Sequence, residues 1–238
     1  MTYRQINEFD AEKFTAAVPT SYVSVPDFYA GKSIFITGGT GFLGKVFLEK
    51  LLYSCKDVET VYILIREKKG KTPQQRVEDL FNKPVSVVFH VAANVQFYKE
   101  FKEIINTNVG GTKYVLQLCQ RIKDIKAFVH ISTAYCHTDQ KVLEERIYPP
   151  PAELSEVLKF LQQPQHDKKQ IKELFISASL KEPLPGWVDS WNGATGLITA
   201  SYNGANRVLL GEGSNFLDLI PVDFVANLAI VAAAKCTR

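Results

Sequence analysis

Several features that mark specialised classes of protein are scarce in this sequence. Its 238 residues include four cysteines, with no Cys-x-x-Cys pair and no Asn-x-Ser/Thr sequon, so neither a disulfide framework nor a zinc knuckle is indicated. An excess of one charge is also lacking. The 28 basic and 25 acidic residues leave a net charge of +3, which is too even to indicate a nucleic-acid binder.

Long hydrophobic runs are missing as well. The most apolar stretch, 216–234, contains Asp218, Asp223 and Asn227, whereas a helix that spans a bilayer needs about 20 largely apolar residues. The N-terminus is polar and of mixed charge, unlike a signal peptide. We therefore expect a cytoplasmic chain with no membrane span, in which 216–234 forms a strand end and a buried helix.

The sequence does contain a regular alternation of apolar strands and amphipathic helices. Short β-branched runs predict strands buried on both faces, and 3.6-residue periodicity predicts helices between them. The predicted strands are 33–37, 61–65, 85–91 and 127–132, and the predicted helices are 42–53, 73–82 and 101–122. Such alternation predicts an α/β fold with a doubly wound, Rossmann-type parallel sheet.

A glycine-rich turn joins the first predicted strand to its helix. Gly39, Gly41 and Gly44 form a GxGxxG pattern, and Gly38 starts an overlapping GxxGxxG. In this context glycines let the backbone approach a diphosphate, which the helix N-terminus binds through its amides and dipole. The segment from Gly39 to Lys45 also matches most of a Walker A motif, but Val46 stands where the magnesium-ligating Ser or Thr is needed, so an ATPase or GTPase is disfavoured.

The residue after the second strand indicates which dinucleotide is bound. NAD-specific sites have an acidic residue there, which binds the ribose hydroxyls. Here the residue is Arg66, and a guanidinium suits a 2′-phosphate in bidentate geometry. The sequence therefore favours NADPH over NAD.

These residues resemble the fatty acyl-CoA reductases, particularly the insect-type members of this branch of the extended short-chain dehydrogenase/reductases. The segments that carry the resemblance are Thr37 to Lys45, Ile65-Arg66, Phe89 to Ala93, Asn108 to Thr112, His130 to Cys136, Tyr148 to Pro151, Lys181 to Asp189 and Ile220 to Asp223. The resemblance covers most of residues 20–235. It implies reduction of long-chain acyl-CoA, through a bound aldehyde, to a fatty alcohol by NADPH. Family members are often associated with the peroxisomal or endoplasmic reticulum membrane, on its cytosolic face.

The resemblance also implies roles for individual residues. The diphosphate would lie against the turn made by Thr37, Gly38, Gly39, Thr40, Gly41, Phe42, Leu43 and Gly44. Arg66 would bind the 2′-phosphate, and Ala92 and Ala93 would pass under the adenosine. Asn108 would brace the sheet or a water, and Ser132 or Thr133 would hydrogen-bond the substrate carbonyl. The reductase domain would span 31–238 after a leader of residues 1–30, with a substrate-side region from about 177.

The family pattern is interrupted in three places. An outer strand and helix are missing between 67 and 84. We expect the Tyr-x-x-x-Lys helix and the strand after it to be missing between 172 and 179, and the family's C-terminal domain to be absent after 238. We therefore expect an incomplete fold in which the chain returns across the first strand and the helix at 74–82 moves to the opposite face. The edge of the second strand is then open, so we expect self-association.

The second interruption bears on catalysis, because the tyrosine protonates the developing alkoxide and the lysine lowers its pKa. Only Tyr98 is followed by a lysine four residues later, Lys102, and that pair precedes the predicted Ser132 strand. Tyr135, Cys136 and His137 are weaker candidates near the cleft, and we expect His90 and His130 to be core histidines with backbone partners. Two alternatives stay open: an NADP-binding fragment without activity and, disfavoured by the 181–189 segment, a sugar-nucleotide epimerase. No metal-ligand spacing occurs among the histidines.

Overall fold

The computed structural model describes residues 23–65, 84–95, 101–132, 148–149, 153–162, 175–177, 181–184, 194–205 and 219–235. Its centre is a parallel sheet of four strands: β1 (Ser33–Thr37), β2 (Thr60–Leu64), β3 (Val87–His90) and β4 (Ala127–His130). All four strands were predicted, with ends that differ by two residues at most. Every residue of β1 and β3 is buried, as expected of strands covered on both faces.

The order of the strands in the sheet is β2-β1-β3-β4. β1 therefore pairs with β2 on one side and with β3 on the other, both in parallel register. This order confirms that the chain crosses back over β1 after β2. The helix predicted at 74–82 lies outside the described residues.

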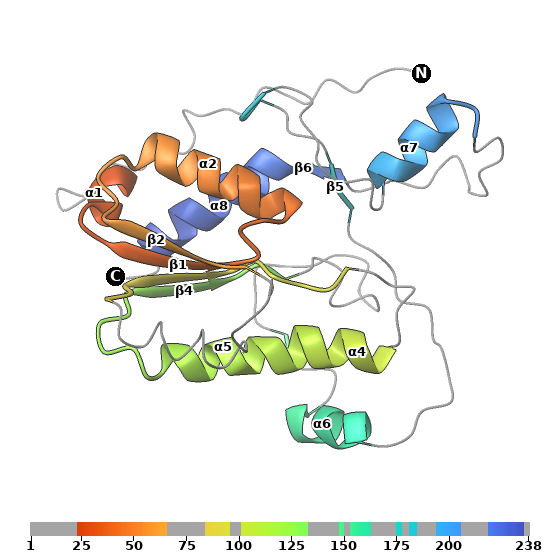
Figure 1. Cartoon of the computed structure of the whole chain (residues 1–238), viewed down its shortest axis with the longest axis horizontal. Coiled ribbons are helices and arrows are strands. Elements are labelled where there is room, and N and C mark those ends of the chain that lie inside the picture. The colour runs from red at the N-terminus through yellow and green to blue at the C-terminus, as the bar shows by residue number, and fades with distance from the viewer. Residues whose placement is uncertain are drawn as a thin grey trace.

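Helices cover both faces of the sheet (Figure 1). On one face, α2 (Phe42–Ser54) packs beside α8 (Val222–Lys235), and their apolar side chains join those of β1 and β3 in the larger core cluster. On the other face, α4 (Phe101–Ile105), the π-helical turn η2 (Asn106–Gly110) and α5 (Gly111–Cys119) follow one another. Phe35 and Val88 pack there against Val115 and Cys119 of α5. The doubly wound α/β fold is thus confirmed, as is the helix at the end of 216–234.

The last residues of the predicted leader belong to the folded domain. They form α1 (Val25–Tyr29), which begins at the N-cap Ser24. The Tyr29 ring is fully buried, and its hydroxyl donates to the carbonyl oxygen of Ile230 in α8 at 2.8 Å. This long-range contact, which sequence periodicity does not reveal, places α1 in the core.

A second sheet contains two parallel strands, β5 (Phe175–Ser177) and β6 (Leu219–Pro221). β5 falls in the interval 172–179, where the sequence predicted that a strand was missing, so that expectation was wrong. The remaining described helices are α6 (Leu154–Gln162) and α7 (Ala194–Tyr202). In the described part of the chain, no helix is both long enough and apolar enough to cross a membrane.

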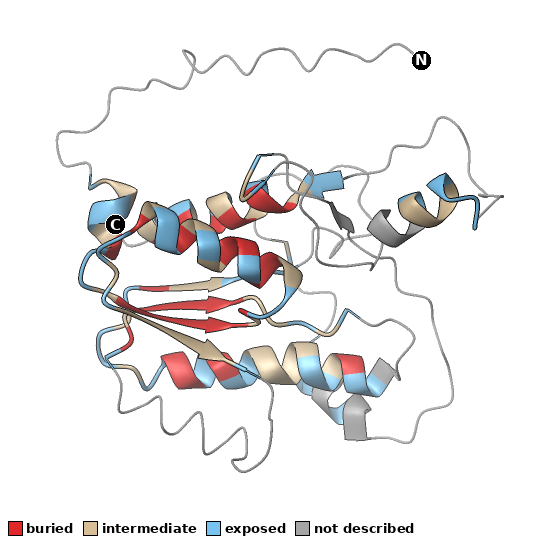
Figure 2. Cartoon of the chain, turned by 45° about the horizontal axis from the view of Figure 1, so that its top comes forward, coloured by how far each residue is buried: buried red, intermediate tan, exposed pale blue. Residues whose placement is uncertain are grey.

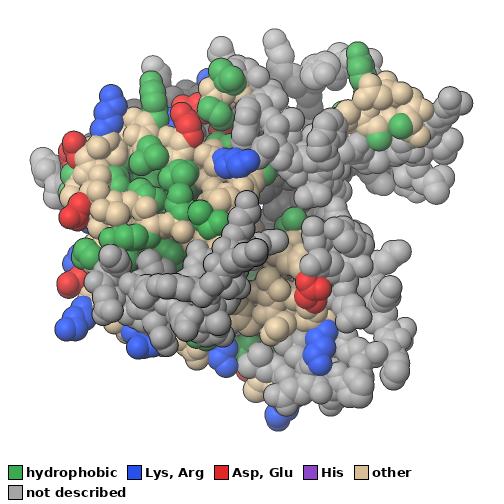
Figure 3. All heavy atoms as spheres, in the orientation of Figure 1, with side chains coloured by type: hydrophobic (Ala, Val, Ile, Leu, Met, Phe, Trp, Pro, Cys, Tyr) green, Lys and Arg blue, Asp and Glu red, His purple; other side chains and the backbone are tan. Residues whose placement is uncertain are grey.

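The edge of the main sheet is less covered than its centre (Figure 2). Every residue of β2 is half-buried, and among the described strands β2 pairs with β1 alone. Figure 3 shows hydrophobic side chains at the surface over the α2 and β2 part of the molecule. Leu52 and Tyr53 of α2, and Ile65 directly after β2, are each half or more exposed. Self-association through this edge stays a prediction.

Candidate functional site

The turn between β1 and α2 requires glycine at two positions for steric reasons. Gly38 has φ +74°, and a Cβ built on it would lie 2.7 Å from the backbone nitrogen of Ala92. A Cβ on Gly44 would lie 2.1 Å from the carbonyl oxygen of Gly38. The turn is therefore packed against the loop after β3 on one side and against the first turn of α2 on the other.

Gly41 is not required by packing of this kind. A Cβ there would meet only the Gly38 carbonyl oxygen, at 3.3 Å, among the described atoms. Gly41 is the N-cap of α2 and makes no side-chain capping hydrogen bond. A helix start without a capping side chain presents amides and the positive end of the dipole to an anion. The absent Cβ leaves room for the diphosphate of a nicotinamide dinucleotide, so the residues of the turn fit such a cofactor.

The other residues of the turn differ in exposure. Thr40 is exposed and Phe42 is half-buried. Leu43 is buried in the core, so only its backbone faces the turn. A Cβ on Gly39 would lie 2.7 Å from Cγ2 of Ile63, so β2 also packs closely against the turn.

The loop after β3 lies beside this turn. The backbone N–H of Ala92 donates to Oγ1 of Thr37, the last residue of β1, at 3.2 Å. Ala92 is half-buried and Ala93 is exposed. The structure therefore brings Thr37, Gly38 and Ala92 together, as the resemblance implied, at the carboxyl ends of the strands.

Asn108 joins this group from the other face of the sheet. Its Oδ1 accepts from the backbone N–H of Asn94 at 2.7 Å, and its Nδ2 donates to the Asn94 carbonyl oxygen at 3.0 Å. Asn108 lies in η2, where the N–H of Gly111 donates to the Asn106 carbonyl oxygen across a π turn. The sequence predicted a plain helix here, although the Gly110-Gly111 pair was an available signal for an irregular turn.

His90 connects these segments through side chains, which corrects the expected backbone partners. Its Nδ1 lies 2.6 Å from Oγ1 of Thr37 and its Nε2 lies 3.1 Å from Oγ1 of Thr112. Its ring stacks on His130 at 5.0 Å between centroids. His90 is buried as predicted, whereas His130 is exposed, so the core assignment was wrong for His130. Burial, with a smaller contribution from His130, lowers the pKa of His90 to about 4.

The lowered pKa predicts a loss of stability in mild acid. The unfolded chain takes up a proton on this residue near pH 6.5, while the folded chain resists it down to about pH 4. His90 therefore does not reduce the free energy of unfolding above pH 6.5. As the pH falls from 6.5 to 4, the unfolded chain is protonated first, and about 3 kcal/mol of the free energy of unfolding is lost. Urea unfolding from pH 7.5 to 4 should show this fall in the wild type and a much smaller one in His90→Gln. Equal slopes in the two proteins would contradict the assignment.

The predicted catalytic residues are only partly within the described chain. Ser132 follows β4 by two residues and is exposed at the same edge of the sheet. Lys102 is in α4, on a helix that precedes β4 in the chain. The remaining candidates, Arg66, Tyr98, Thr133, Tyr135, Cys136 and His137, lie outside the described residues.

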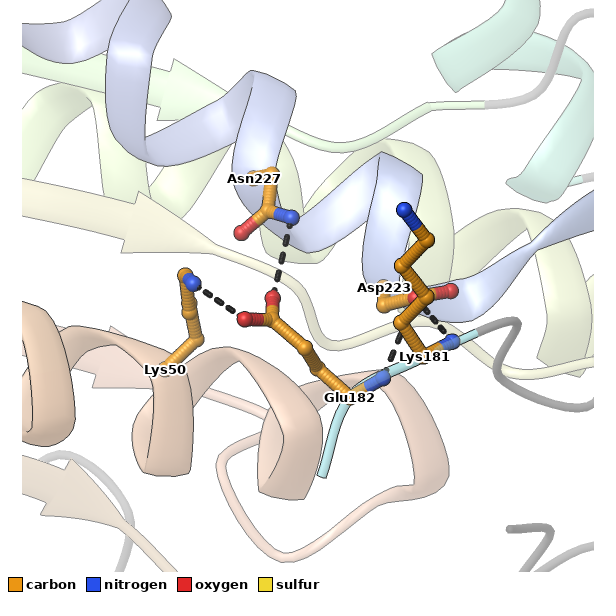
Figure 4. Close-up of polar contacts among 5 residues, drawn as sticks. All are labelled: Lys50, Lys181, Glu182, Asp223 and Asn227. Atoms are coloured by element: carbon orange, nitrogen blue, oxygen red, sulfur yellow. Dashed lines mark hydrogen bonds and ion pairs between the residues drawn. The ribbon is translucent and has the colours of Figure 1, made fainter. Parts of the chain in front are cut away.

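The substrate-side segment at 181–184 is attached to α8 by Asp223. This carboxylate is 3% exposed, and its Oδ2 accepts from the backbone N–H groups of Lys181 at 2.9 Å and Glu182 at 3.3 Å. Figure 4 shows Asp223 at the start of α8, beside this segment. A single buried carboxylate thus fixes the backbone of 181–182.

Glu182 adds a second attachment, to α2. Its Oε1 pairs with Nζ of Lys50 at 2.5 Å, and its Oε2 accepts from Nδ2 of Asn227 at 3.2 Å (Figure 4). The hydrogen bond from Lys50 holds the pKa of Glu182 below its usual range. The sequence singled out Glu182 as part of a motif but carried no signal for Lys50 or Asn227 as its partners.

Comparison with known proteins places the chain in a family. The sequence profile described as male sterility protein, an NAD-binding domain, matches residues 36–86 and 78–179, more than half of the chain. Human fatty acyl-CoA reductase 1 is 31% identical over 288 residues, and fatty acyl-CoA reductase 1 of Xenopus laevis is 32% identical over 288 residues. Each alignment covers 89% of this chain and 56% of the relative, so the chain spans a little over half the length of these proteins.

Solved structures support the fold. The terminal R domain of the myxalamid biosynthetic pathway has a TM-score of 0.59 and 18% identity, with 87% of this chain and 62% of that chain covered. A dTDP-glucose 4,6-dehydratase of Bacillus anthracis, solved with NAD, has a TM-score of 0.55 and 19% identity, with 87% and 73% covered. Both likenesses concern the Rossmann-type fold.

The alignments also bear on the predicted interruptions. The human alignment runs over 288 residues, and 89% of 238 residues is about 212, so about 76 aligned positions have no residue in this chain. The two parts of the family match overlap at 78–86, which includes the end of the first predicted interruption. The matched family profile covers more than half of the chain and shows that this chain belongs to the male sterility protein family, and the curated relatives that it resembles are named fatty acyl-CoA reductases.

Proposed function

We propose that this chain binds NADPH and reduces long-chain fatty acyl-CoA to fatty alcohol. The observation that carries the proposal is the start of α2, where Gly41 caps the helix without a side chain and leaves space for a diphosphate. The names of the curated relatives, fatty acyl-CoA reductases, support acyl-CoA as the substrate class. When bound, the reduced nicotinamide would supply hydride. The chain's own residues would hold the nucleotide between the turn and the Ala92–Ala93 loop, and Ser132 or Thr133 would hydrogen-bond the substrate carbonyl.

A second candidate is a nucleotide-binding chain that does not turn over. The sequence has ten tyrosines, and only Tyr98 has a lysine four residues later. That pair precedes the Ser132 strand in the chain, whereas the family motif follows it. Without a general acid, reduction is expected to be slower by about 10²–10⁴-fold.

One pair of assays separates these candidates. NADPH binding is followed by nucleotide fluorescence, and turnover by oxidation of NADPH in the presence of a long-chain acyl-CoA. Binding with turnover supports the reductase, and binding without turnover supports the second candidate. Absence of NADPH binding would refute the proposed role of the glycine turn.

The preference for NADPH is attributed to Arg66 and is tested by removing its guanidinium. Arg66→Met should raise the Kd for NADPH by about 10- to 100-fold, because hydrogen bonds to a charged phosphate are lost, and should leave the Kd for NADH unchanged. Lys69→Met removes a nearby charge outside the proposed contact and is the matched control, with an expected change below about 3-fold. Equal losses in the two variants would indicate a general charge effect instead.

A further inference from the structure

A continuous chain of hydrogen bonds crosses the sheet beside the glycine turn. It begins at the backbone N–H of Ala92, which donates to Oγ1 of Thr37 at 3.2 Å. It passes through both ring nitrogens of His90, 2.6 Å from Thr37 Oγ1 and 3.1 Å from Thr112 Oγ1. It ends where Thr112 Oγ1 donates to the carbonyl oxygen of Asn108 at 2.6 Å.

The two ends of this chain of hydrogen bonds determine which atom donates and which accepts at every step. A carbonyl oxygen only accepts, so the Thr112 hydroxyl hydrogen points to Asn108 and Thr112 Oγ1 accepts from His90. His90 therefore carries its proton on Nε2. In the neutral ring Nδ1 is then an acceptor, and the Thr37 hydroxyl donates to it. Every donor and acceptor in the chain is used once, and no other tautomer of a neutral His90 satisfies all four bonds.

This chain of hydrogen bonds connects three segments that are far apart in the sequence. Thr37 ends β1 at the glycine turn, Ala92 lies against Gly38 in the loop after β3, and Asn108 lies in the π turn on the opposite face. The Asn108 side chain also returns to this loop, because it holds both backbone groups of Asn94. The loop is thus held at Ala92 through Thr37 and at Asn94 through Asn108, and His90 links those two points.

We propose that His90 is a positioning residue that joins the glycine turn, the Ala92–Asn94 loop and the π turn of Asn108 into one unit through this directed chain of hydrogen bonds. The proposal deepens the proposed function and rests on it where nucleotide affinity is concerned. A break at the Thr112 end then loosens the Ala92 end, although Thr112 lies on the other side of His90. Two independent structural contacts would not behave in this way.

Thr112 offers the sharpest test because it contacts His90 without belonging to the turn. Thr112→Val removes the hydroxyl at nearly constant volume, and Thr112→Ser keeps it as the matched control. In the protein without nucleotide, we expect amide hydrogen exchange at Ala92 to become at least about 10-fold faster in Thr112→Val and to stay near the wild-type rate in Thr112→Ser. Nitrogen-15 NMR should show the Nε2–H tautomer of His90 in the wild type and a mixture of tautomers in Thr112→Val. An unchanged Ala92 rate in Thr112→Val, or an Nδ1–H tautomer in the wild type, would overturn the proposal.

Nucleotide affinity provides the second measurement. Thr112→Val and Thr37→Val should each raise the Kd for NADPH by about 5- to 10-fold, the effect of one hydrogen bond. The double variant should be little worse than either single variant, since one break interrupts the whole chain. Losses that multiply in the double variant would show separate contacts and overturn the coupling. If the wild type does not bind NADPH, the proposed function fails, and the exchange and NMR measurements still decide the role of His90.

Discussion

Gly44→Ala is expected to abolish NADPH binding and to lower the free energy of unfolding by about 3 kcal/mol or more. The new Cβ would lie 2.1 Å from the Gly38 carbonyl oxygen and 2.7 Å from Cα of Gly39. Both atoms are backbone, so no side-chain rotation relieves the overlap, and the start of α2 must move away from the turn. Urea unfolding and NADPH fluorescence measure the two effects.

Gly111 provides the matched control for this variant, and Gly41 provides a second test of the binding site. Gly111 begins α5, has an ordinary helical conformation, and has no described atom within 4 Å of a built Cβ. Gly111→Ala should therefore leave NADPH affinity unchanged and stabilise the fold by up to about 1 kcal/mol. Gly41→Ala should separate the two effects of Gly44→Ala. Its Cβ would lie 3.3 Å from the Gly38 carbonyl oxygen, a tight contact that a shift of a few tenths of an ångström relieves, so the free energy of unfolding should fall by about 1 kcal/mol or less, while the Kd for NADPH should rise at least about 10-fold. If Gly41→Ala binds NADPH normally, the diphosphate does not rest at the start of α2.

The sequence was informative where one physical requirement dominates a short segment. In the run 33–37 the only polar residues are at the two ends. This pattern therefore predicted a parallel strand buried on both faces, as the structure has it. The glycines of the turn are likewise explained by local geometry, since Gly38 adopts a positive φ. The strand pattern and the positive φ of Gly38 can be judged from residues close together in the chain, whereas the contact of Gly38 with Ala92 cannot.

Features that depend on distant partners could not be predicted. Nothing near His90 in the sequence indicates Thr37 or Thr112, which lie 53 and 22 residues away in the chain. The contact between Tyr29 and Ile230 spans 201 residues and draws α1 out of the predicted leader into the core. The strand β5 has three residues and pairs with β6 alone among the described strands, so its formation depends on a segment more than forty residues later.

Asp223→Ala is expected to cost about 3–5 kcal/mol of the free energy of unfolding. The carboxylate is buried, and its Oδ2 accepts from the N–H groups of Lys181 and Glu182, so its removal leaves two amide donors without this acceptor. The negative charge also lies in the first turn of α8, where the helix dipole stabilises it. Thermal unfolding should show a decrease in Tm of about 6–20 °C.

Asp223→Asn and Glu182→Gln define what the carboxylate contributes. Asparagine keeps one oxygen at the position of Oδ2 but loses the charge, so Asp223→Asn should cost about 1–2 kcal/mol, less than alanine. Glu182→Gln weakens the partly exposed pair with Lys50 and should cost less than about 1 kcal/mol. If Asp223→Ala lowered the free energy of unfolding as little as Glu182→Gln does, the 181–184 segment would be held by other contacts. The expected order, with alanine at 223 the most severe, follows because the Asp223 carboxylate is buried and binds backbone, whereas the Glu182 pair is accessible to water.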